Sequence, residues 1–535
     1  MSDFFDGEAL AAVVFLAFVA VSLLLCGLAA ADEDDPEHFY AGGAALGPVG
    51  GGLAIAGDYV SAATLISTTG AVALNGADGI LFACASVASL ALVMVVLARP
   101  LRHKGVYTLG DFLTVRLADP SVRRALGVAT LVVLVPLLVV QLTAAGQIMV
   151  SMFGLPEELL SACTIGCGAM MICYSALGGM RGTGYIQILK TVILVGVVVV
   201  VAGVVLSRFG FSPLSLFSAA RDGSGQGGAY AVPGLQFGDD LAGRLSLVGF
   251  LITLVLGPAF MPHITMRLHP MGPDSARRAT AWAVSPVAIV CGCVVVIGLG
   301  AAALVGGAAL RASDPLGNSS LLVITSALDP QPGGPRHSML FAMVAIAVFV
   351  TTLSTVAGIT LAAASSLARD FTERRRDGSR RSAKREVRFA RWAVGAVGVL
   401  AVIVATQAYG RNPQALMIFS FTAAASVLPP VLLGAVYGRG ITANGVRWAV
   451  YGTLPVVTLL LAYSPATSGS PIALFPDVDF HWFPMNSPAL ITVPLGFLLA
   501  RLGSRAQRKP AVSSSNPNGS GSASGLPSGR VQSWR

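Results

Sequence analysis

Charged residues are scarce in this chain. Asp, Glu, Lys and Arg make up 11% of the 535 residues, whereas hydrophobic residues make up 54% and the mean hydropathy is +0.75. Soluble domains carry about 25% charged residues, so this composition excludes a chain that exposes most of its surface to water. The apolar runs are also too long for the strands of a membrane β-barrel, which need only about 10 residues each. The sequence therefore predicts an all-α polytopic membrane protein.

Motifs of several other protein classes are missing. The seven cysteines all lie inside apolar runs, which indicates small buried side chains and not a disulfide framework. The sequence has no phosphate-binding Gly-rich loop ending in Lys, no HExxH, and no GxSxG between a strand and a helix, so we expect no enzyme. A channel is disfavoured because the chain offers neither a charged ring nor a repeated filter loop.

We interpret thirteen apolar segments as membrane spans, several of them with ends that extend beyond the apolar run, because a bilayer core of about 30 Å needs about 20 helical residues. They lie near residues 10–30, 46–74, 80–97, 126–150, 160–177, 186–206, 245–266, 281–310, 340–366, 392–408, 415–436, 448–463 and 489–500. The tail at 502–535 is rich in Ser, Gly and Pro, which predicts disorder.

Basic residues predict the orientation. With thirteen spans and a cytoplasmic C-terminus, 29 Lys and Arg residues lie inside and six Arg residues lie outside. The densest inside loop, 369–391, is interpreted as an orientation and lipid-headgroup segment and not as a regulatory site. The acidic loop at 31–39 disagrees, but acidic residues count little in this rule. We expect a multi-pass plasma-membrane protein with its N-terminus outside, whose net charge of +9 reflects orientation and not nucleic-acid binding.

Glycines and an acid interrupt the second span. The stretch "GGGLAIAGDYVSAA" begins at Gly50 and carries Gly57 and Asp58 near the middle of the span. An ionised Asp at mid-span costs about 2.5–3.5 kcal/mol, and a helix can break in lipid only where protein or ions satisfy the freed carbonyl groups. A break and a carboxylate at one depth indicate a binding site. The other interpretation is a Gly-packed continuous helix with a neutral or interfacial Asp58.

Prolines interrupt the seventh span, which reads "LGPAFMPHITMRL". Pro258 and Pro262 cannot lie in an unbroken helix, because each proline lacks a donor and clashes one turn back. His263 follows directly and either lines a site or is satisfied by the backbone; Arg267 is assigned to the cytoplasmic end of the span. The two interrupted spans, the second and the seventh, are five helices apart, counting from one break to the next. Paired broken helices of an inverted repeat mark the binding site of a secondary transporter.

These repeats predict a division of the chain. The segments are an extra helix and acidic loop (1–40), a first repeat (41–206), an extracellular loop (207–244), a second repeat (245–438), two peripheral helices (439–501) and the tail (502–535).

Hydroxyl groups share one face of the ninth span. In "FVTTLSTVAGITLAAASS", Thr351, Ser354 and Thr355 have the spacing i, i+3, i+4. A hard cation prefers oxygen ligands, so these hydroxyls together with carbonyls freed at Ala56 and Tyr59 are candidate ligands. Alternatively, the hydroxyls bond back to carbonyls one turn earlier or join helices together.

The sequence resembles the sodium:solute symporter family and is most similar to its cation/acetate (monocarboxylate) branch. The resemblance is carried by "GGGLAIAGDYVSAA", "YTLGDFLTVRL", "YSALGGMRGTGYIQILKTVIL", "LGPAFMPHITMRL" and "VAGITLAAASSLARDF". It implies about thirteen transmembrane helices in a leucine-transporter-type 5+5 inverted repeat with two broken helices. It further implies that sodium binds between the first broken helix and the ninth span; the residues implied are Ala56, Asp58, Tyr59, Thr351, Ser354 and Thr355.

We therefore expect a symporter that takes up a small monocarboxylate, such as acetate, propionate or pyruvate, with Na⁺ by alternating access. Proton coupling through Asp58, or a different small solute such as proline or a sugar, stays an alternative. The residues expected to line the substrate site are Ser61, Thr64, Gly257 and His263. Half-helix N-termini favour a carboxylate there. We expect no organic cofactor; the expected partners are the anion, Na⁺ or H⁺, and the lipid bilayer.

Overall fold

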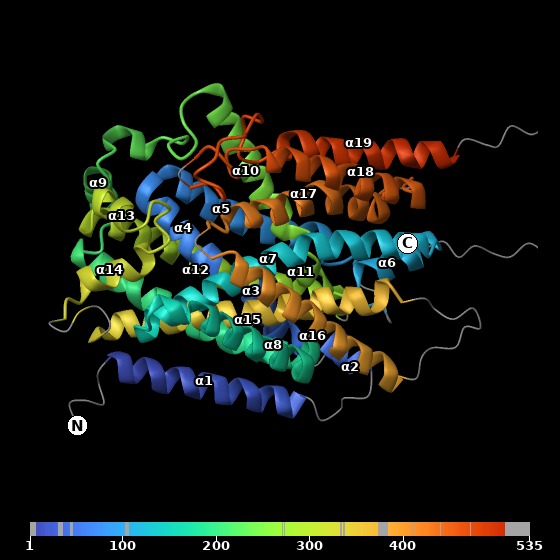
Figure 1. Ribbon diagram of the computed structural model, residues 1–535, viewed down its shortest axis with the longest axis horizontal. Coiled ribbons are helices and arrows are strands. Elements are labelled where there is room, and N and C mark those ends of the chain that lie inside the picture. Colours follow the sequence, from blue (N-terminus) through green and yellow to red (C-terminus); the bar gives the residue numbers. More distant parts are fainter. Residues whose placement is uncertain are drawn as a thin grey trace, which may run out of the picture.

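The long helices of the chain run side by side along the long axis of the molecule (Figure 1). The computed structural model describes residues 7–508 except 30–35, 43–45, 102–105, 270, 272, 332–333, 335–336, 373–382, 410, 439 and 471. Most of the predicted disordered tail and the middle of the basic loop lie outside the described residues. Within them, the prediction of an all-α polytopic membrane protein is confirmed.

The described helices differ widely in length, from a single turn to more than a membrane thickness. In chain order they are α1 (Gly7–Ala29), α2 (Pro36–Ala41), α3 (Gly47–Tyr59), α4 (Ala62–Asn75), α5 (Ala77–Leu92), η4 (Val93–Leu97), α6 (Leu109–Leu117), α7 (Ser121–Phe153), η5 (Glu157–Leu159), α8 (Leu160–Arg208), α9 (Pro213–Gly223), η6 (Gly227–Ala231), α10 (Leu241–Ala259), α11 (Pro262–Met266), α12 (Pro273–Leu304), α13 (Gly307–Ser313), α14 (Ser320–Leu328), α15 (Met339–Asp370), α16 (Ala383–Gln407), α17 (Gln414–Val436), α18 (Ala443–Ala462) and α19 (Ala489–Arg508).

Helix α8 contains two membrane spans. It is 49 residues long, so as a straight helix it would extend about 74 Å, more than twice the roughly 30 Å of a bilayer core. The backbone at Gly179 is not helical, with φ 51° and ψ −153°. Such a conformation is open almost only to glycine. The two apolar segments predicted at 160–177 and 186–206 are therefore the two halves of α8.

Contacts with α15 show that the chain reverses at this glycine. Ser175 in the first half donates a hydrogen bond to the carbonyl of Ala357 at 2.9 Å, and Gln187 in the second half donates to the carbonyl of Ser354 at 2.9 Å. Twelve residues of straight helix would separate these donors by about 18 Å, yet their acceptors lie one turn apart. Both halves therefore lie against the same stretch of α15.

The number of spans agrees with the sequence. Eleven helices in the described residues are long and apolar enough to cross a membrane, and the pair α3 and α4, bent by 61°, passes the same test as one broken span. The second half of α8 brings the total to the thirteen predicted spans. In Figure 1, α1 begins at the left end of the bundle and α19 ends at the right, as an odd number of spans requires.

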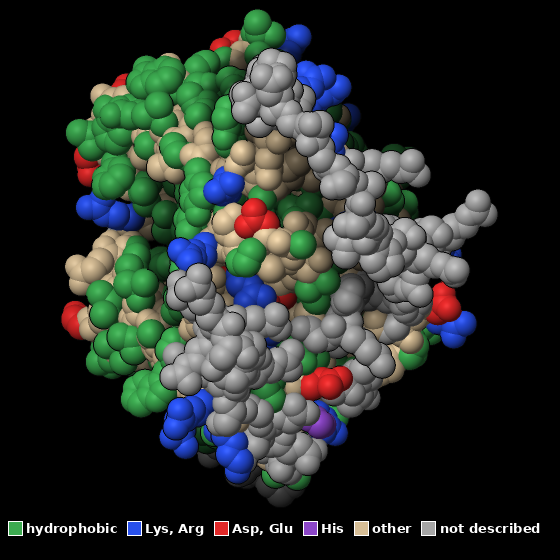
Figure 2. All heavy atoms as spheres, turned by 90° about the vertical axis from the view of Figure 1, so that its right-hand side faces the viewer, with side chains coloured by type: hydrophobic (Ala, Val, Ile, Leu, Met, Phe, Trp, Pro, Cys, Tyr) green, Lys and Arg blue, Asp and Glu red, His purple; other side chains and the backbone are tan. Residues whose placement is uncertain are grey.

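Ion pairs close the right-hand end of the bundle, which we call the basic end; Figure 2 shows Lys and Arg side chains around it. The carboxylate of Asp111 in α6 binds Arg123 of α7 and Arg369 of α15, each at 2.7 Å. Arg369 also lies 4.7 Å from the ring centre of Tyr107 and pairs with Glu386 of α16. These contacts join four helices. That the basic end faces the cytoplasm stays a prediction of the charge distribution.

We expect Gly179→Ala to destabilise the protein. The substitution forces a side chain into a positive-φ conformation, which costs about 1–3 kcal/mol, and the new Cβ would lie 2.9 Å from the carbonyl oxygen of Phe39. Thermal unfolding of the detergent-solubilised variant should show a lower midpoint. The matched control is Gly196→Ala in the same helix, where nothing lies within 4 Å of the added Cβ. Equal midpoints for both variants would contradict the reversal at Gly179.

Candidate functional site

The second span breaks between α3 and α4. Helix α3 ends at Tyr59, Val60 is extended with ψ 107°, and Ser61 is extended with ψ 162°. Ser61 begins α4 as its N-cap: its hydroxyl oxygen accepts a hydrogen bond from the Thr64 N–H at 3.1 Å and lies 2.9 Å from the Thr64 hydroxyl. The predicted break is confirmed: α3 ends at Tyr59, the residue after the Gly57–Asp58 pair that suggested the break.

The break changes the partners of two carbonyl groups. In a continuous helix the carbonyls of Gly57 and Val60 would accept from the N–H groups four residues later, which belong to Ser61 and Thr64. The Thr64 N–H binds the Ser61 hydroxyl instead. A carbonyl without a partner is costly inside a membrane, so both oxygens require another donor.

Lys190 of α8 supplies that donor. Its ammonium nitrogen lies 2.5 Å from the carbonyl oxygen of Gly57, 2.7 Å from that of Val60 and 2.8 Å from the hydroxyl oxygen of Thr355 on α15. The side chain is completely buried. The charge count of the sequence assigned Lys190 to the cytoplasmic side, and this was wrong: the side chain points into the break. The sequence signal was a lysine in the apolar run "YIQILKTVIL".

The seventh span breaks between α10 and α11. Helix α10 ends at Ala259, and Met261 is extended with ψ 133° because the residue before a proline is disfavoured in the helical conformation. Pro262 then begins the five-residue helix α11. The predicted interruption of this span is confirmed at Pro262, whereas the expectation that Pro258 also interrupts the helix was wrong, because Pro258 lies in the last turn of α10.

An ion pair connects the two breaks. The guanidinium group of Arg267, directly after α11, binds the carboxylate of Asp58 at the end of α3, and the two side chains are 4% and 2% exposed. Arg267 lies directly after the last residue of its span, in agreement with its expected place at an end of that span, but its side chain is buried. A charged partner explains how Asp58 is tolerated at this depth, because a buried charge must be paired.

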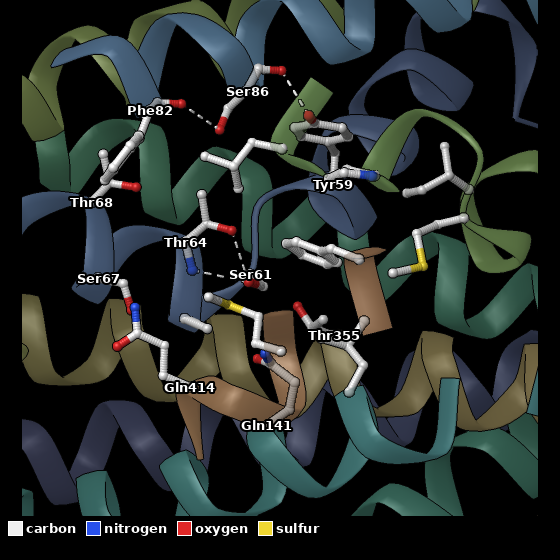
Figure 3. Close-up of a pocket in the computed structure, with 18 of the residues that line it drawn as sticks. Tyr59, Ser61, Thr64, Ser67, Thr68, Phe82, Ser86, Gln141, Thr355 and Gln414 are labelled. Carbon is white, nitrogen blue, oxygen red and sulfur yellow. Dashed lines mark hydrogen bonds between the residues drawn. The ribbon is translucent and has the colours of Figure 1, made fainter. Parts of the chain in front are cut away.

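A cavity of about 850 Å³, its mouth included, opens from the breaks toward the end opposite the basic end. Figure 3 shows Ser61 and Thr64 at the start of α4, with Gln141 and Thr355 below them in this view. The wall is mostly apolar; residues of this kind include Phe82, Leu137, Phe250, Met261, Met417 and Phe421. Of the four predicted substrate-site residues, Ser61, Thr64 and His263 line the cavity.

Gly257, the fourth predicted substrate-site residue, serves packing. It does not line the cavity, and a Cβ there would lie 2.6 Å from the carbonyl oxygen of Phe421. The glycine thus allows α10 and α17 to approach closely. The glycine before Pro258, which suggested a site residue in the sequence, is thus explained by the close packing of α10 on α17.

The hydroxyl groups of α15 form internal bonds. The Ser354 hydroxyl donates to the carbonyl of Val350 at 2.7 Å, and the Thr355 hydroxyl donates to that of Thr351 at 2.8 Å. The bonds back to the preceding turn, considered from the sequence, are thus present. Each hydroxyl oxygen can still accept a bond, and Thr355 accepts from Lys190.

Of the residues predicted to bind sodium, Thr355 of α15 lies at the junction with the break, because Lys190 binds both its hydroxyl and the carbonyls of Gly57 and Val60. Two of the predicted ligands already have partners: the Ala56 carbonyl accepts a hydrogen bond from the Val60 N–H at 3.0 Å, and Asp58 pairs with Arg267. Their chemistry suits a hard cation. With the Lys190 ammonium among them, however, the set does not fit a sodium ion.

Comparison with known proteins agrees with this architecture. A model of the sodium:solute symporter family matches residues 39–453. The chain is 31% identical over 503 residues to the monocarboxylic acid transporter of Corynebacterium glutamicum, covering 92% of this chain and 90% of that protein. It is 32% identical over 495 residues to the uncharacterized symporter YwcA of Bacillus subtilis, covering 92% and 93%.

A solved structure shows the same fold. The substrate-bound, outward-open state of a Na⁺-coupled sialic acid symporter matches with a TM-score of 0.69 at 12% identity, covering 93% of this chain and 98% of that one. The predicted leucine-transporter-type inverted repeat with two broken helices is confirmed.

Removing one member of the Asp58–Arg267 pair should strongly destabilise the protein. Asp58→Asn or Arg267→Gln leaves a buried charge unpaired, which costs about 3–5 kcal/mol, whereas the double variant removes both charges and should recover most of the loss. Thermal unfolding of the four proteins measures this coupling. Arg221→Gln in the exposed Arg221–Asp222 pair is the control and should change stability by less than about 0.5 kcal/mol. Additive losses in the double variant would contradict a buried pair.

Proposed function

The chain belongs to the sodium:solute symporter family, and on that premise we propose that it takes up a small monocarboxylate together with a cation by alternating access. One observation carries the proposal: a mostly apolar cavity ends at the broken second span, where hydroxyl groups surround the start of α4. The name of the relative from Corynebacterium glutamicum, a monocarboxylic acid transporter, supports this class of substrate.

The start of α4 suits a carboxylate. The N-terminal end of a helix carries a partial positive charge and N–H groups without helical acceptors. Helix α4 is 14 residues long, and Ser61, Ala63 and Thr64 of its first turn line the cavity. In the proposed complex the carboxylate lies against this turn, and His263 and Gln141 provide further polar contacts from the wall. The alkyl group of the anion lies against the apolar side chains.

The apolar wall favours a small anion over a polyol. Burying a hydroxyl group without a hydrogen-bond partner costs about 1–3 kcal/mol on the evidence of protein substitutions. A sugar presents several such groups to a cavity whose exposed wall area is mostly apolar, although Ser, Thr and Gln side chains lie between its Phe, Leu, Met and Ala side chains. Acetate, propionate and pyruvate each present one carboxylate and a short apolar or keto part.

Two cations come into question for coupling. Sodium is the ion for which the family is named, although the ligands that the sequence predicts for it (oxygens of Ala56, Asp58, Tyr59, Thr351, Ser354 and Thr355) do not fit the ion while the Lys190 ammonium lies among them. The proton is the alternative that the sequence also allows. One monovalent cation with one monocarboxylate is electroneutral, so accumulation driven by the membrane potential requires more than one cation for each anion.

The closed basic end and the open cavity correspond to one stage of alternating access. The cavity extends from the breaks to Gln236 of the segment between α9 and α10 and to Gln414 at the start of α17. The ion pairs around Asp111 and Arg369 join helices at the other end. In the proposed cycle these pairs separate when the cavity closes on its substrate, and the carboxylate leaves through the basic end.

Uptake by proteoliposomes should identify the substrate. We expect labelled acetate, propionate or pyruvate to accumulate under an inward cation gradient, and unlabelled monocarboxylates to compete, whereas proline and glucose should not. Accumulation of proline or glucose without competition by any monocarboxylate would assign the protein to another solute of the same family.

Deleting a hydroxyl at the start of α4 should weaken substrate binding. We expect Thr64→Val and Ser61→Ala each to raise KM for the anion about tenfold, because a hydrogen bond to a charged group contributes about 1.5–3 kcal/mol. Initial uptake rates over a range of substrate concentrations measure this. The control is Thr69→Val in the same helix, whose hydroxyl binds only the Leu65 carbonyl within α4, at 2.7 Å. An unchanged KM in both test variants would place the carboxylate elsewhere.

A further inference from the structure

We propose that the ammonium group of Lys190 is the resident cation at the junction between the α3–α4 break and α15, and that no sodium ion binds at this junction during transport. The proposal rests on the proposed symport and describes how the same site is charged. It departs from the sodium site that the family resemblance implies.

The hydrogen-bonding capacity of Lys190 is fully used. A lysine ammonium has three N–H donors and no acceptor, and three oxygens lie 2.5, 2.7 and 2.8 Å from its nitrogen. Two are backbone carbonyls at the break and one is a hydroxyl of α15. Such oxygens, drawn from an unwound helix and a neighbouring helix, are those with which transporters hold a cation. The ammonium therefore has the ligands that a bound ion would require.

The backbone around Lys190 is packed to place this group. A Cβ at Gly57 would lie 2.6 Å from the carbonyl oxygen of Gln187, so only glycine lets α3 approach α8 this closely. Gln187, one turn before Lys190, donates to the carbonyl of Ser354 at 2.9 Å. Helix α8 thus contacts both sides of the junction through adjacent turns, and Lys190 reaches its acceptors without leaving the interior.

The charges around the junction disfavour a second cation. Helix α3 contributes Asp58, α11 contributes His263, and Arg267 follows α11, whereas residues 351–366 of α15 contain no ionisable side chain. Because Asp58 is paired with Arg267, no carboxylate among the residues that the structure describes forms an ion pair with Lys190. With His263 neutral, these groups sum to one positive charge. A sodium ion about 4 Å from the ammonium would bind on the order of a thousandfold more weakly at an effective dielectric constant of 20.

This arrangement has two consequences for transport. While Lys190 is protonated, the junction carries a positive charge without any bound ion, so the first turn of α4 lies beside an attraction for a carboxylate. Of the two coupling cations that the sequence allows, the proton is then the one that drives uptake.

The wild-type protein provides the first test. Labelled acetate uptake is measured in proteoliposomes at equal pH on both sides, in sodium chloride and in choline chloride, and again with an inward proton gradient in choline chloride. We expect initial rates in the two salts to agree within about twofold, and the proton gradient to support accumulation without sodium. A loss of tenfold or more in choline chloride would overturn the proposal.

Thermal unfolding of purified protein provides a test that does not depend on transport. A ligand that binds the folded state raises the melting temperature, so sodium should leave wild-type protein unchanged relative to choline. In Lys190→Ala the carbonyls and the Thr355 hydroxyl are released, and sodium should raise the melting temperature by several degrees. Adding Thr355→Val should abolish that increase, whereas adding Thr352→Val should not, because the Thr352 hydroxyl binds only the Val348 carbonyl, at 2.8 Å.

The outcomes separate the two proposals. If no monocarboxylate is taken up in either salt, the proposed function fails, and the melting temperatures still decide the role of Lys190. If Lys190→Ala does not fold, the wild-type comparison decides. Stabilisation of the wild-type protein by sodium that is lost in Thr355→Val would show that sodium binds beside the ammonium, and would overturn the proposal.

Discussion

A broken helix in lipid must find partners for the carbonyl groups that it releases, and this requirement organises the centre of the molecule. The chain breaks after Tyr59 and leaves the carbonyls of Gly57 and Val60 without their helical donors. Water cannot satisfy them in the core of a bilayer. Lys190 does so from a neighbouring helix. Three features allow that amine to reach the break. Helix α8 lies close to α3, Gly57 permits this close approach, and the Thr355 hydroxyl accepts the third hydrogen bond of the amine.

The same requirement explains the charges. A buried ammonium is tolerated because its three donors all have acceptors, and a buried carboxylate is tolerated because Arg267 pairs with it. Together they leave the region beside the cavity positive. A cavity that is otherwise mostly apolar then combines attraction for a negative charge with space for a short hydrocarbon group. This combination is the physical basis for expecting a small carboxylate. It arises because Lys190 satisfies the backbone carbonyls that the helix break leaves without donors.

Much of this architecture follows from the sequence, because lipid restricts what a chain can do. Long apolar runs give the spans, and Pro262 gives the second break, since the residue before a proline is disfavoured in the helical conformation. The role of Lys190 was not predicted, because a lysine near the end of an apolar run is expected to extend toward the membrane surface. Its burial depends on a carbonyl group 133 positions away in the chain. The packing role of Gly257 was missed for a similar reason: its contact with Phe421 cannot be inferred without the packing of α10 on α17.

The pairing of Asp58 with Arg267 has a mechanical consequence. It fastens the last turn of α3 to the residue that follows α11, and these are the two short half-helices on the basic-end side of the breaks. Neither half-helix can move away alone without leaving the charge of Asp58 or Arg267 unpaired in the protein interior. The two half-helices are therefore expected to move together as one rigid unit, so that the pathway to the basic end opens in a single concerted step.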